Sequence, residues 1–411
     1  MEQKIIDHLF RHQFGKMVSI LTRIFGLAHL ETIEDAVQDT FVKAMLSWRT
    51  QMPDNPEAWL MQAAKNRMID LFRKLSAEQK RVPNFASGAS SIAMQNMFLK
   101  HEIEDSQLRM IFTACHPLLN PQDQISFALK TISGFSIKEI ASALLLKEET
   151  VKKRLLRARK SIKNKSITFE IPMGAELPER LNRVLEVLYL IFNEGFHSNK
   201  KDILVRKELC GEAIRLSQML LNNDLTKHAN SYALFALMCF QSARLDSKVN
   251  EKNELVDLKN QDRSKWYFPL IKMGNDAMFK AVANGMFSSY HFEAAIVAEH
   301  LKALNFESTN WDKIYSWYEK LYELQPLSIT LLNMAIVQLQ RNEFESAFLL
   351  LQKINPTDLE QRAYLFYGSL AEYFIKKEDY NNAITSIDKA IGLVKNESEK
   401  EYLIKKKQSL F

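Results

Sequence analysis

The sequence predicts an all-α protein with two or three domains. The chain has 411 residues, of which 46% are hydrophobic, enough to bury a core in each domain. Gly (11) and Pro (10) are both scarce for this length. Few turn formers combined with many good helix formers favour helices throughout. Three widely separated cysteines, Cys115, Cys210 and Cys239, argue against a disulfide framework and fit a reducing cytoplasm.

Several absences narrow the class of protein. No run of about 18 apolar residues occurs, so we expect no membrane span, and the N-terminus does not read as a signal peptide. No glycine-rich phosphate loop, Gly-x-Ser-x-Gly or His-Glu-x-x-His motif occurs, so we expect neither an enzyme nor a cofactor. Cys115 and His116 are adjacent, but adjacent residues rarely chelate one ion together. No second pair has ligand spacing, so we expect no metal.

The positive charge is concentrated in the first two-fifths of the chain. Residues 1–165 carry 25 Lys and Arg against 17 Asp and Glu, whereas the remainder carries 30 against 32. Residues 148–165 alone hold eight bases and two acids. A basic front part joined to a near-neutral back part predicts a nucleic-acid-binding module with an appended domain of another kind.

The first helical block runs to about residue 82. One of its helices carries an apolar stripe at i, i+4, i+7 and i+11, made of Val37, Phe41, Ala44 and Trp48. Polar side chains point away from that stripe, namely Asp35, Gln38 and Asp39. They suit a basic or polar partner surface, or else a solvated helix face. A breaker at 52–56 ends this helix.

The next helix begins with Asn55 as its cap and Pro56 in its first turn. Its buried side is predicted to hold Leu60, Ala64, Met68 and Leu71. Its polar stripe and the bases beside it are Asn66, Asp70 and Arg73, with Lys65, Arg67 and Lys74. Asn and Arg can read base edges, and a cationic helix can hold a displaced DNA strand. Trp59 could stack on an unpaired base, but we favour a core position for it.

Residues 83–100 are predicted to be a linker, because 83–96 are small and polar. A second block, 101–168, centres on residues 133–163. Ser136 and Glu139 form a capping box for a short helix. A brief turn and a long basic helix follow, which is the layout of a helix-turn-helix. Leu145 departs from that pattern, because glycine is usual in the turn.

The helix-turn-helix has a predicted core and a predicted DNA-facing side. The core residues are Ile140, Ala141, Leu144, Val151 and Leu155. The outward residues are Glu149, Thr150, Lys152, Lys153, Arg154 and Arg157. Lysine and arginine suit phosphates and guanine edges, and residues near the N-terminus of such a helix lie nearest the bases. The alternative is a solvated basic helix.

Residues 169–411 are predicted to be helical, with a weak internal repeat near the C-terminus. Ala335, Phe344 and Ala347 recur 36 residues later as Ala371, Tyr380 and Ala383. An aromatic residue three positions before a small one, at a period near 34, is typical of tetratricopeptide helix pairs.

These segments together resemble the extracytoplasmic-function sigma factors. TIEDAVQDTFVKA (32–44) resembles the polymerase-binding segment of their region 2, residues 55–74 resemble the promoter-melting and −10-reading segment, and 133–163 resemble region 4. LPERL (177–181), VLYLIFNEGF (187–196), QDRSKW (261–266) and YHFEAAI (290–296) resemble the C-terminal extension of one subgroup, whose members carry tetratricopeptide-like repeats.

The resemblance implies a division into region 2 (1–82), linker (83–100), region 4 (101–168) and a C-terminal regulatory domain (169–411). It implies bacterial core RNA polymerase and promoter DNA as partners. The implied polymerase-binding residues are Asp35, Gln38, Asp39 and Lys43. The implied −10-binding residues are Trp59, Asn66, Arg67, Asp70, Arg73 and Lys74. The implied −35-binding residues are Glu149, Thr150, Lys152, Lys153, Arg154, Arg157 and Arg159.

Polar residues within apolar surroundings mark two places in the C-terminal part. They are Asn193, Glu194, Gln261, Asp262 and Arg263. We favour buried hydrogen-bond networks that fix helix packing. The alternative is a recognition surface for a regulatory protein or a small ligand.

Two other hypotheses compete with a sigma factor. A tetratricopeptide scaffold or ordinary regulator with a helix-turn-helix would bind an operator without polymerase. An enzyme in the C-terminal half has no motif in its favour.

Overall fold

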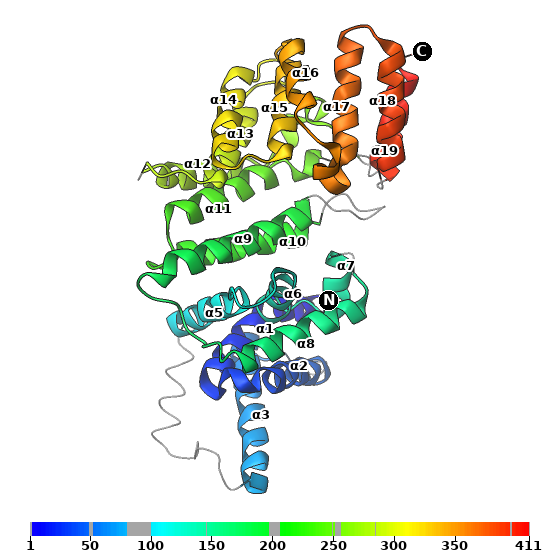
Figure 1. Cartoon of the computed structure of the whole chain (residues 1–411). Helices are drawn as coiled ribbons and strands as arrows, with labels where there is room; N and C mark the ends of the chain where they lie inside the picture. The colour runs from blue at the N-terminus through cyan, green and yellow to red at the C-terminus, as the bar shows by residue number, and fades with distance from the viewer. Residues whose placement is uncertain are drawn as a thin grey trace. The chain divides into compact units, whose positions relative to one another are not determined.

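The computed structural model describes residues 2–48, 52–79, 100–144, 146–196, 206–248, 250, 256–283, 285–394 and 397–410. All regular structure in these ranges is helical, with no strand. The described chain divides into two units, one up to Leu190 and one from Ile191 onward. The colours of the ribbon in Figure 1 follow the residue number through both units. The predicted all-α class is therefore confirmed.

Unit 1 is built around its first helix, α1 (Glu2–Phe25). Phe14, Met17, Val18 and Leu21 are fully buried on one face, at the spacing of a helix that buries a single stripe. Around α1 pack α2 (Leu30–Ser47), α3 (Pro56–Gln79), α5 (Lys100–Ala114) and α6 (Pro121–Thr131). A short turn, η1 (Leu27–His29), joins α1 to α2 after Gly26, whose φ of 93° suits glycine.

The remainder of unit 1 is the helix-turn-helix and the start of α9. α7 (Ile137–Ala143) and α8 (Glu148–Asn164) pack together, and α8 also packs on α6. α9 (Glu176–Phe196) crosses the division between the units. Its Arg180 donates to the carbonyl oxygen of Phe112 in α5 at 3.0 Å, which ties the first part of α9 into unit 1.

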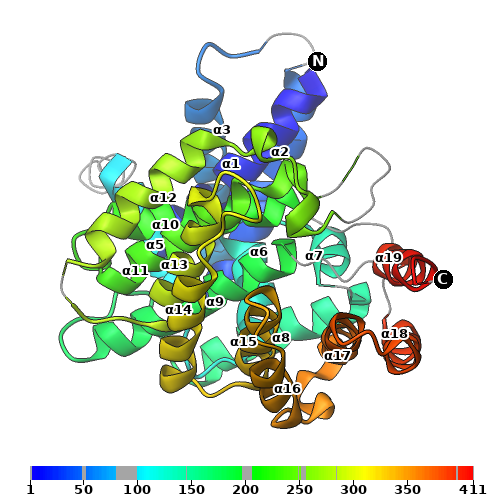
Figure 2. The same ribbon diagram turned by 90° about the horizontal axis from the view of Figure 1, so that it is seen from above.

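Unit 2 continues with antiparallel helix pairs. α10 (Lys207–Leu221), α11 (Ala229–Ser242) and α12 (Phe268–Ala281) are followed by α13 (Ser289–Lys302) and α14 (Trp311–Leu324). Three short turns, η2 (Leu245–Ser247), η3 (Leu258–Asn260) and η4 (Arg263–Lys265), lie between α11 and α12. Next come α15 (Ser328–Gln340) and α16 (Phe344–Gln352), then η5 (Pro356–Arg362), α17 (Ala363–Lys376), α18 (Tyr380–Leu393) and α19 (Glu397–Gln408). In Figure 2, α17, α18 and α19 follow one another at one end of the unit.

The predicted internal repeat corresponds to two of these pairs. Phe344 and Tyr380 are the first residues of α16 and α18, and Ala347 and Ala383 are fully buried one turn later. The turns before these helices also match. Asn342 and Glu378, 36 residues apart, have φ of 61° and 58°. The amide that follows each donates to a carbonyl five residues back, Glu343 to Gln338 and Asp379 to Phe374, at 2.9 Å in both cases. Both copies therefore share one backbone turn, while their identity as tetratricopeptide repeats stays a prediction.

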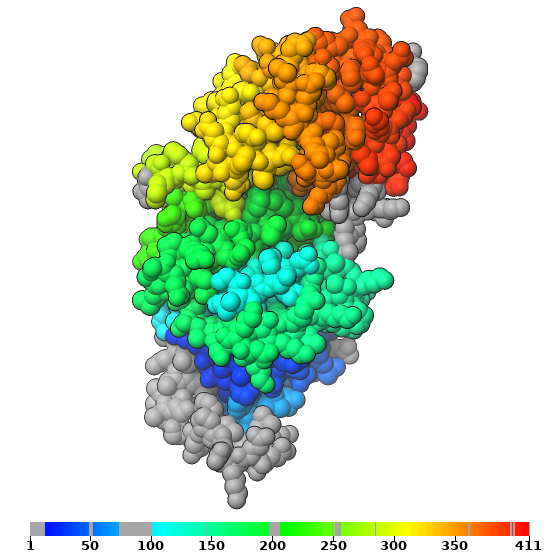
Figure 3. All heavy atoms as spheres, viewed as in Figure 1, coloured from blue at the N-terminus to red at the C-terminus, as the bar shows by residue number. Residues whose placement is uncertain are grey.

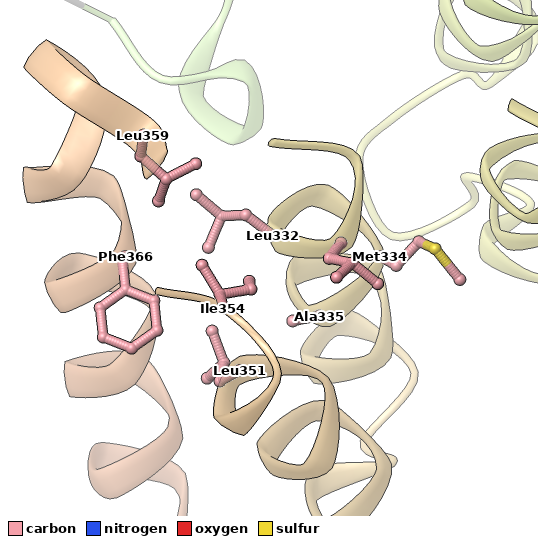
Figure 4. Close-up of a cluster of buried hydrophobic side chains, with 8 residues drawn as sticks. Leu332, Met334, Ala335, Leu351, Ile354, Leu359 and Phe366 are labelled. Carbon is pink, nitrogen blue, oxygen red and sulfur yellow. The ribbon is translucent and has the colours of Figure 1, made fainter. Parts of the chain in front are cut away.

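The hydrophobic core between the pairs is made by side chains from three consecutive helices. Leu332 and Ala335 of α15, Leu351 of α16 and Phe366 of α17 converge with Leu359 of η5 (Figure 4). Each helix pair buries one face against the next pair, so each pair is stabilised mainly by its contacts with the adjacent pairs.

Candidate polymerase and promoter interfaces

α2 has a buried and an exposed face, as predicted. Val37, Phe41, Ala44 and Trp48 are at most 4% exposed. Asp35, Asp39 and Lys43 are exposed on the outer face, and Gln38 is half-buried. The four residues proposed to bind polymerase are therefore accessible or partly so.

Sequence reasoning missed two apolar side chains on this outer face. Val42 is 56% exposed and Leu46 is 60% exposed. They follow Asp39 at i+3 and i+7, so they extend the same side of α2. A helix face that combines acidic residues with exposed apolar ones is better suited to contact another helix than to remain in solvent. The helical spacing of Val42 and Leu46 from Asp39 is the sequence signal that could have placed them on this face.

α3 begins as the sequence predicts. The Asn55 Oδ1 atom accepts a hydrogen bond from the amide of Ala58 at 3.0 Å, and Pro56 is the first helical residue. Leu60, Ala64 and Met68 are fully buried. Leu71, predicted on the buried side, is only half-buried, and Phe72 is buried instead, with its ring 5.0 Å from that of Phe25.

The polar stripe of α3 is exposed, and its charged side chains are paired within α3 or with α2. Asn66, Arg67, Asp70 and Arg73 are all exposed. Arg67 forms an ion pair with Asp39 of α2 at 3.1 Å, and Arg73 lies 3.7 Å from Asp70. Lys65 is buried, and the side chain of Lys74 lies outside the described residues.

Trp59 is half-buried. Its ring lies edge-on to the buried Trp48 ring, with centroids 5.4 Å apart. This packing favours a structural position for Trp59, the reading preferred from the sequence.

The helix-turn-helix has the predicted cap and core. The Glu139 amide donates to Ser136 Oγ at 3.1 Å, and the Ser136 amide donates to Glu139 Oε2 at 2.8 Å. The buried side chains are Ile140, Ala141, Val151 and Leu155, whereas Leu144 is half-buried. Leu145 lies outside the described residues.

The N-terminal part of α8 presents an exposed polar face. Glu149, Lys152 and Lys153 are exposed, whereas Thr150 and Arg154 are half-buried. Lys152 Nζ lies 2.7 Å from Glu149 Oε1, an exposed pair of the kind that contributes little to stability. Lys152 and Lys153 are thus the exposed cations in the first two turns of α8.

Arg154 and Arg157 are bonded to α6. Arg154 donates to Gln122 Oε1 at 2.7 Å. Arg157 donates to both carboxylate oxygens of Asp123, at 2.7 and 3.1 Å, and that carboxylate is 5% exposed. The hydrogen bonds that Arg157 donates to Asp123, with the negative charge of that carboxylate, raise the pKa of Arg157. This bidentate pair fixes α8 against α6, a role that the sequence did not indicate.

A groove of about 740 Å³ lies between α8 and the start of α6. Its basic side chains come from Arg157, Lys160 and Lys165, and its α6 side includes Asn120, which caps α6 by accepting from the Gln122 amide at 3.0 Å. Asp123, which pairs with Arg157, also lines the groove, so the cations left for a phosphate group beside the helix N-terminus are the lysines.

Arg159 lies on a different face of α8 from Lys152. It contacts Glu34 and Glu31 of α2, and only 24% of its side chain is exposed. In this arrangement Arg159 is directed toward α2, so its DNA-binding role stays a prediction without support from the geometry.

The QDRSKW segment forms a hydrogen-bonded turn. Arg263 donates to the carbonyl oxygens of His300 and Ala303, at 2.8 and 2.6 Å, and so caps the end of α13. Gln261 Nε2 donates to Val256 at 3.2 Å, and Ser247 donates to Gln261 at 3.4 Å. Asp262 accepts from the Ser264 amide at 3.0 Å. These contacts support the packing interpretation.

The FNEGF segment is likewise set by packing. A Cβ on Gly195 would lie 2.8 Å from the Cys210 sulfur and 2.9 Å from the Arg206 carbonyl oxygen, so only glycine allows this approach of α9 to α10. Glu194 lies 4.0 Å from Arg206, and burial raises the pKa of Glu194. Asn193 is half-buried.

Cys115, Cys210 and Cys239 are buried as free thiols, and burial raises the pKa of each to about 12. Among the described residues no group of three or more His, Cys, Asp or Glu could hold a metal ion. None of the helices in the described ranges has the length and apolarity needed to cross a bilayer.

Known families match three parts of the chain. Residues 3–78 match sigma-70 region 2, residues 109–162 match sigma-70 region 4, and residues 180–282 match a family of unknown function, DUF6596. No solved structure matches the chain significantly.

Individual relatives cover either most of the chain or only its first part. An uncharacterised protein of Rhizobium meliloti is 32% identical over 91% of this chain and 89% of its own length. The ECF RNA polymerase sigma factor SigE of Mycolicibacterium smegmatis is 25% identical over 38% of this chain and 60% of its own length. The ferric citrate uptake sigma factor FecI of Escherichia coli is 28% identical over 37% of this chain and 85% of its own length.

Regions 2 and 4 in this order along one chain define a sigma factor, a non-enzymatic factor for promoter recognition. The chain belongs to the extracytoplasmic-function sigma factors, with a C-terminal helical extension consistent with the DUF6596 match. The region 2 match (3–78) spans α1–α3, and the region 4 match (109–162) runs from within α5 to the last turn of α8.

Proposed function

We propose that this sigma factor docks on core RNA polymerase through the outer face of α2. Asp35, Gln38, Asp39 and Lys43 provide the polar contacts, and the exposed Val42 and Leu46 provide apolar ones. The observation that carries the proposal is this mixed polar and apolar face. It lies opposite the buried stripe of α2, a helix within the residues that match sigma-70 region 2. Exposed apolar side chains among acids favour a protein partner over solvent.

The promoter contacts follow from α3 and α8. Asn66, Arg67, Asp70 and Arg73 of α3 would contact the −10 element, with Lys74 continuing the basic stripe. Glu149, Thr150, Lys152 and Lys153 at the start of α8 would contact base edges of the −35 element. The groove at Lys160 would hold a backbone phosphate, with Arg157 held by Asp123 at its side. We assign Trp59 a supporting position against Trp48, and Arg154 a position bonded to Gln122 of α6.

Run-off transcription tests this function. Bacterial core RNA polymerase is supplied with fragmented genomic DNA, with and without the protein. We expect new start sites that share a −35 and a −10 element. If no new transcript appears with full-length protein or with the truncated form described next, an ordinary DNA-binding regulator becomes the better explanation.

The C-terminal part would regulate the activity in cis or through a protein or ligand partner. A truncation tests this role, and the structure sets where to cut. Cutting after residue 168 would remove Arg180, which bonds to Phe112 of region 4, so the cut belongs after residue 196. Promoter output that is the same with and without residues 197–411 would contradict regulation in cis.

A further inference from the structure

Three side chains that can carry a positive charge lie near one another in unit 2. Arg244 follows the end of α11, Arg263 belongs to η4, and His300 lies in the last turn of α13. Each of them is half-buried, so part of each side chain faces solvent. In Figure 3 the described residues from 240 to 303 carry the green to yellow colours of unit 2. None of the three takes part in the polymerase and promoter contacts proposed above.

Hydrogen bonds and ring contacts hold the three side chains together. Ser247 Oγ donates to the carbonyl oxygen of Arg244 at 2.8 Å and accepts from Trp266 Nε1 at 2.9 Å. The guanidinium group of Arg263 lies over the Trp266 ring, 4.6 Å from its centre. One nitrogen of that guanidinium group, Nη1, donates to the carbonyl oxygen of His300 at 2.8 Å. The end of α11, the η4 turn and the end of α13 therefore meet at this point.

Each of the three side chains has a buried nitrogen atom without a hydrogen-bond partner. These atoms are Arg244 Nε, Arg263 Nη2 and His300 Nδ1. Both arginine nitrogens are donors, and the histidine nitrogen is a donor in one of its two tautomers. Buried polar groups in proteins are nearly always hydrogen-bonded, and a buried charge without a partner is costly. The three atoms therefore share the lack of an acceptor.

The positive charges of the cluster are also poorly balanced. Burial, with the charge of Arg263, lowers the pKa of Arg244 to about 10. Burial, with the charges of both arginines, lowers the pKa of His300 to about 3, so this imidazole is neutral near pH 7. Glu307 opposes the lowering of the Arg263 pKa, but its side chain is exposed. Two guanidinium groups thus repel each other at a partly buried place.

A second arginine shows the pairing that Arg244 lacks. Arg244 donates to the side-chain oxygen of Gln241, three residues earlier, at 2.7 Å. Arg341 follows α15 and donates in the same way to Gln338 at 2.8 Å. Arg341 also pairs with Asp312 at 2.7 Å, and among the described residues no carboxylate does the same for Arg244. The position of Arg244 therefore calls for a negative charge from outside the described chain.

We propose that Arg244, Arg263 and His300 form a binding site for a phosphate group, either free phosphate or that of a small phosphate monoester. A phosphate monoester carries a charge of about −1.5 to −2 at pH 7, which balances two guanidinium groups. Its oxygen atoms accept several charge-assisted hydrogen bonds at once, and the planar guanidinium group matches their spacing. A carboxylate would balance only one of the two charges.

A bound phosphate group would bridge three segments of unit 2. It would join the end of α11 to η4 and to the end of α13, and so fix these helices relative to one another. This site specifies the ligand for the regulation proposed for the C-terminal part, and that regulatory meaning rests on the proposed function. Phosphate binding itself is measured without polymerase or DNA, so its failure is distinguishable from failure of the proposed function.

Isothermal titration calorimetry of the full-length protein tests the site. Inorganic phosphate and glycerol phosphate are titrated at constant ionic strength, with succinate as a dicarboxylate control. We expect inorganic phosphate to bind with a dissociation constant of about 1 mM or tighter. Arg244→Gln should weaken this binding about tenfold or more, because a charge-assisted contact is lost. Tighter binding of glycerol phosphate would support a monoester as the ligand, and tighter binding of inorganic phosphate would support the free ion.

Matched variants separate this site from other cationic places. Arg341→Gln removes the same charge from a guanidinium group that has its own carboxylate, and it should leave phosphate binding unchanged. Phosphate held in the groove beside α8 would respond to Lys160→Glu and not to Arg244→Gln. That pattern, or no binding at all, overturns the site. Equally tight binding of succinate overturns the choice of phosphate.

Urea unfolding gives a readout that a merely structural role of Arg244 would not produce. Without phosphate, Arg244→Met should unfold at the same urea concentration as the wild type or a higher one, because it removes an unbalanced charge. With phosphate at about ten times the dissociation constant, only the wild type should gain stability. A variant that is destabilised without phosphate would show that the protein already balances this charge, and would overturn the site.

Discussion

Asp123 changes the expected roles of the basic side chains on α8. Sequence spacing places Arg157 among the DNA-reading residues, yet both its bonds to Asp123 reach a carboxylate that is 5% exposed. The two residues are 34 positions apart, so no local pattern could pair them. By contrast, the exposed positions of Lys152 and Lys153 follow from helical periodicity alone.

We expect Asp123→Asn to lower the stability of the protein, and the double change Lys152→Glu, Lys153→Glu to remove transcription without lowering stability. Asp123→Asn weakens a charge-assisted bond at a buried site and should lower the free energy of unfolding by about 1–3 kcal/mol. The lysine changes should abolish −35-dependent transcription and leave the urea midpoint unchanged. Urea unfolding and run-off transcription of both proteins check this, and a destabilised lysine variant would contradict it.

Lys248 gives a residue-scale prediction on pH. Its amine bonds to the carbonyl oxygen of Phe196 and lies 3.8 Å from the centre of that ring. Burial, with the charge of Arg244, lowers the pKa of Lys248 to about 7. Between a pH of about 7 and the ordinary pKa of lysine, Lys248 is protonated in the unfolded chain and neutral in the folded one. The free energy of unfolding therefore increases as the pH rises through this range.

Lys248→Met keeps the aliphatic contact and removes the titration. We expect the variant to gain stability over the wild type at about pH 7 and to lose that advantage by about pH 10. Urea midpoints of both proteins across this range measure the difference. Lys272→Met, at an exposed position of α12, serves as the control. A difference that does not change with pH would argue against a buried, titrating Lys248.

At the scale of the helices, the sequence predicted those with a strong local signal. The Asn55 cap, the Ser136–Glu139 capping box and the repeated aromatic starts of α16 and α18 all lie where expected. Each depends on residues within one or two turns. The Arg159–Glu34 contact joins residues 125 positions apart, so only the packing of helices reveals it. The roles proposed for the exposed residues stay predictions, because exposure permits a contact without identifying the partner.

The repeated turn offers a prediction for one element. Glu378 has a φ of 58°, a conformation that costs a residue with a side chain roughly 1 kcal/mol more than glycine. Glu378→Gly should therefore raise the free energy of unfolding by about 0.5–1 kcal/mol. Chemical denaturation measures this gain. The matched change Glu372→Gly, inside α17, should instead destabilise the protein.

At the scale of the whole molecule, the three buried thiols report on the two units separately. Cys115 belongs to unit 1, and Cys210 and Cys239 belong to unit 2. A thiol whose pKa is raised to about 12 by burial reacts only when its surroundings open. The pattern of labelling therefore distinguishes unfolding of one unit from unfolding of the other.

A change in the core of unit 2 tests that separation. A Cβ on Gly274 would lie 2.5 Å from the Phe240 ring, next to Cys239 in sequence, so Gly274→Ala overpacks the contact of α12 with α11. We expect faster alkylation of Cys239, followed by mass spectrometry, and an unchanged rate at Cys115. Equal acceleration at both would mean that the chain unfolds as one cooperative body.

The shared turn at Asn342 and Glu378 also bears on the history of the C-terminal part. Two positions 36 residues apart keep the same unfavourable backbone angle, although their side chains differ. Such agreement is expected if a helix pair was duplicated as a block and then diverged. Excision of residues 343–378 would join Asn342 to Asp379 and regenerate the same turn, with α15 leading into α18. We expect such a deletion to shorten the C-terminal part by one helix pair and to keep the backbone turn at the new junction.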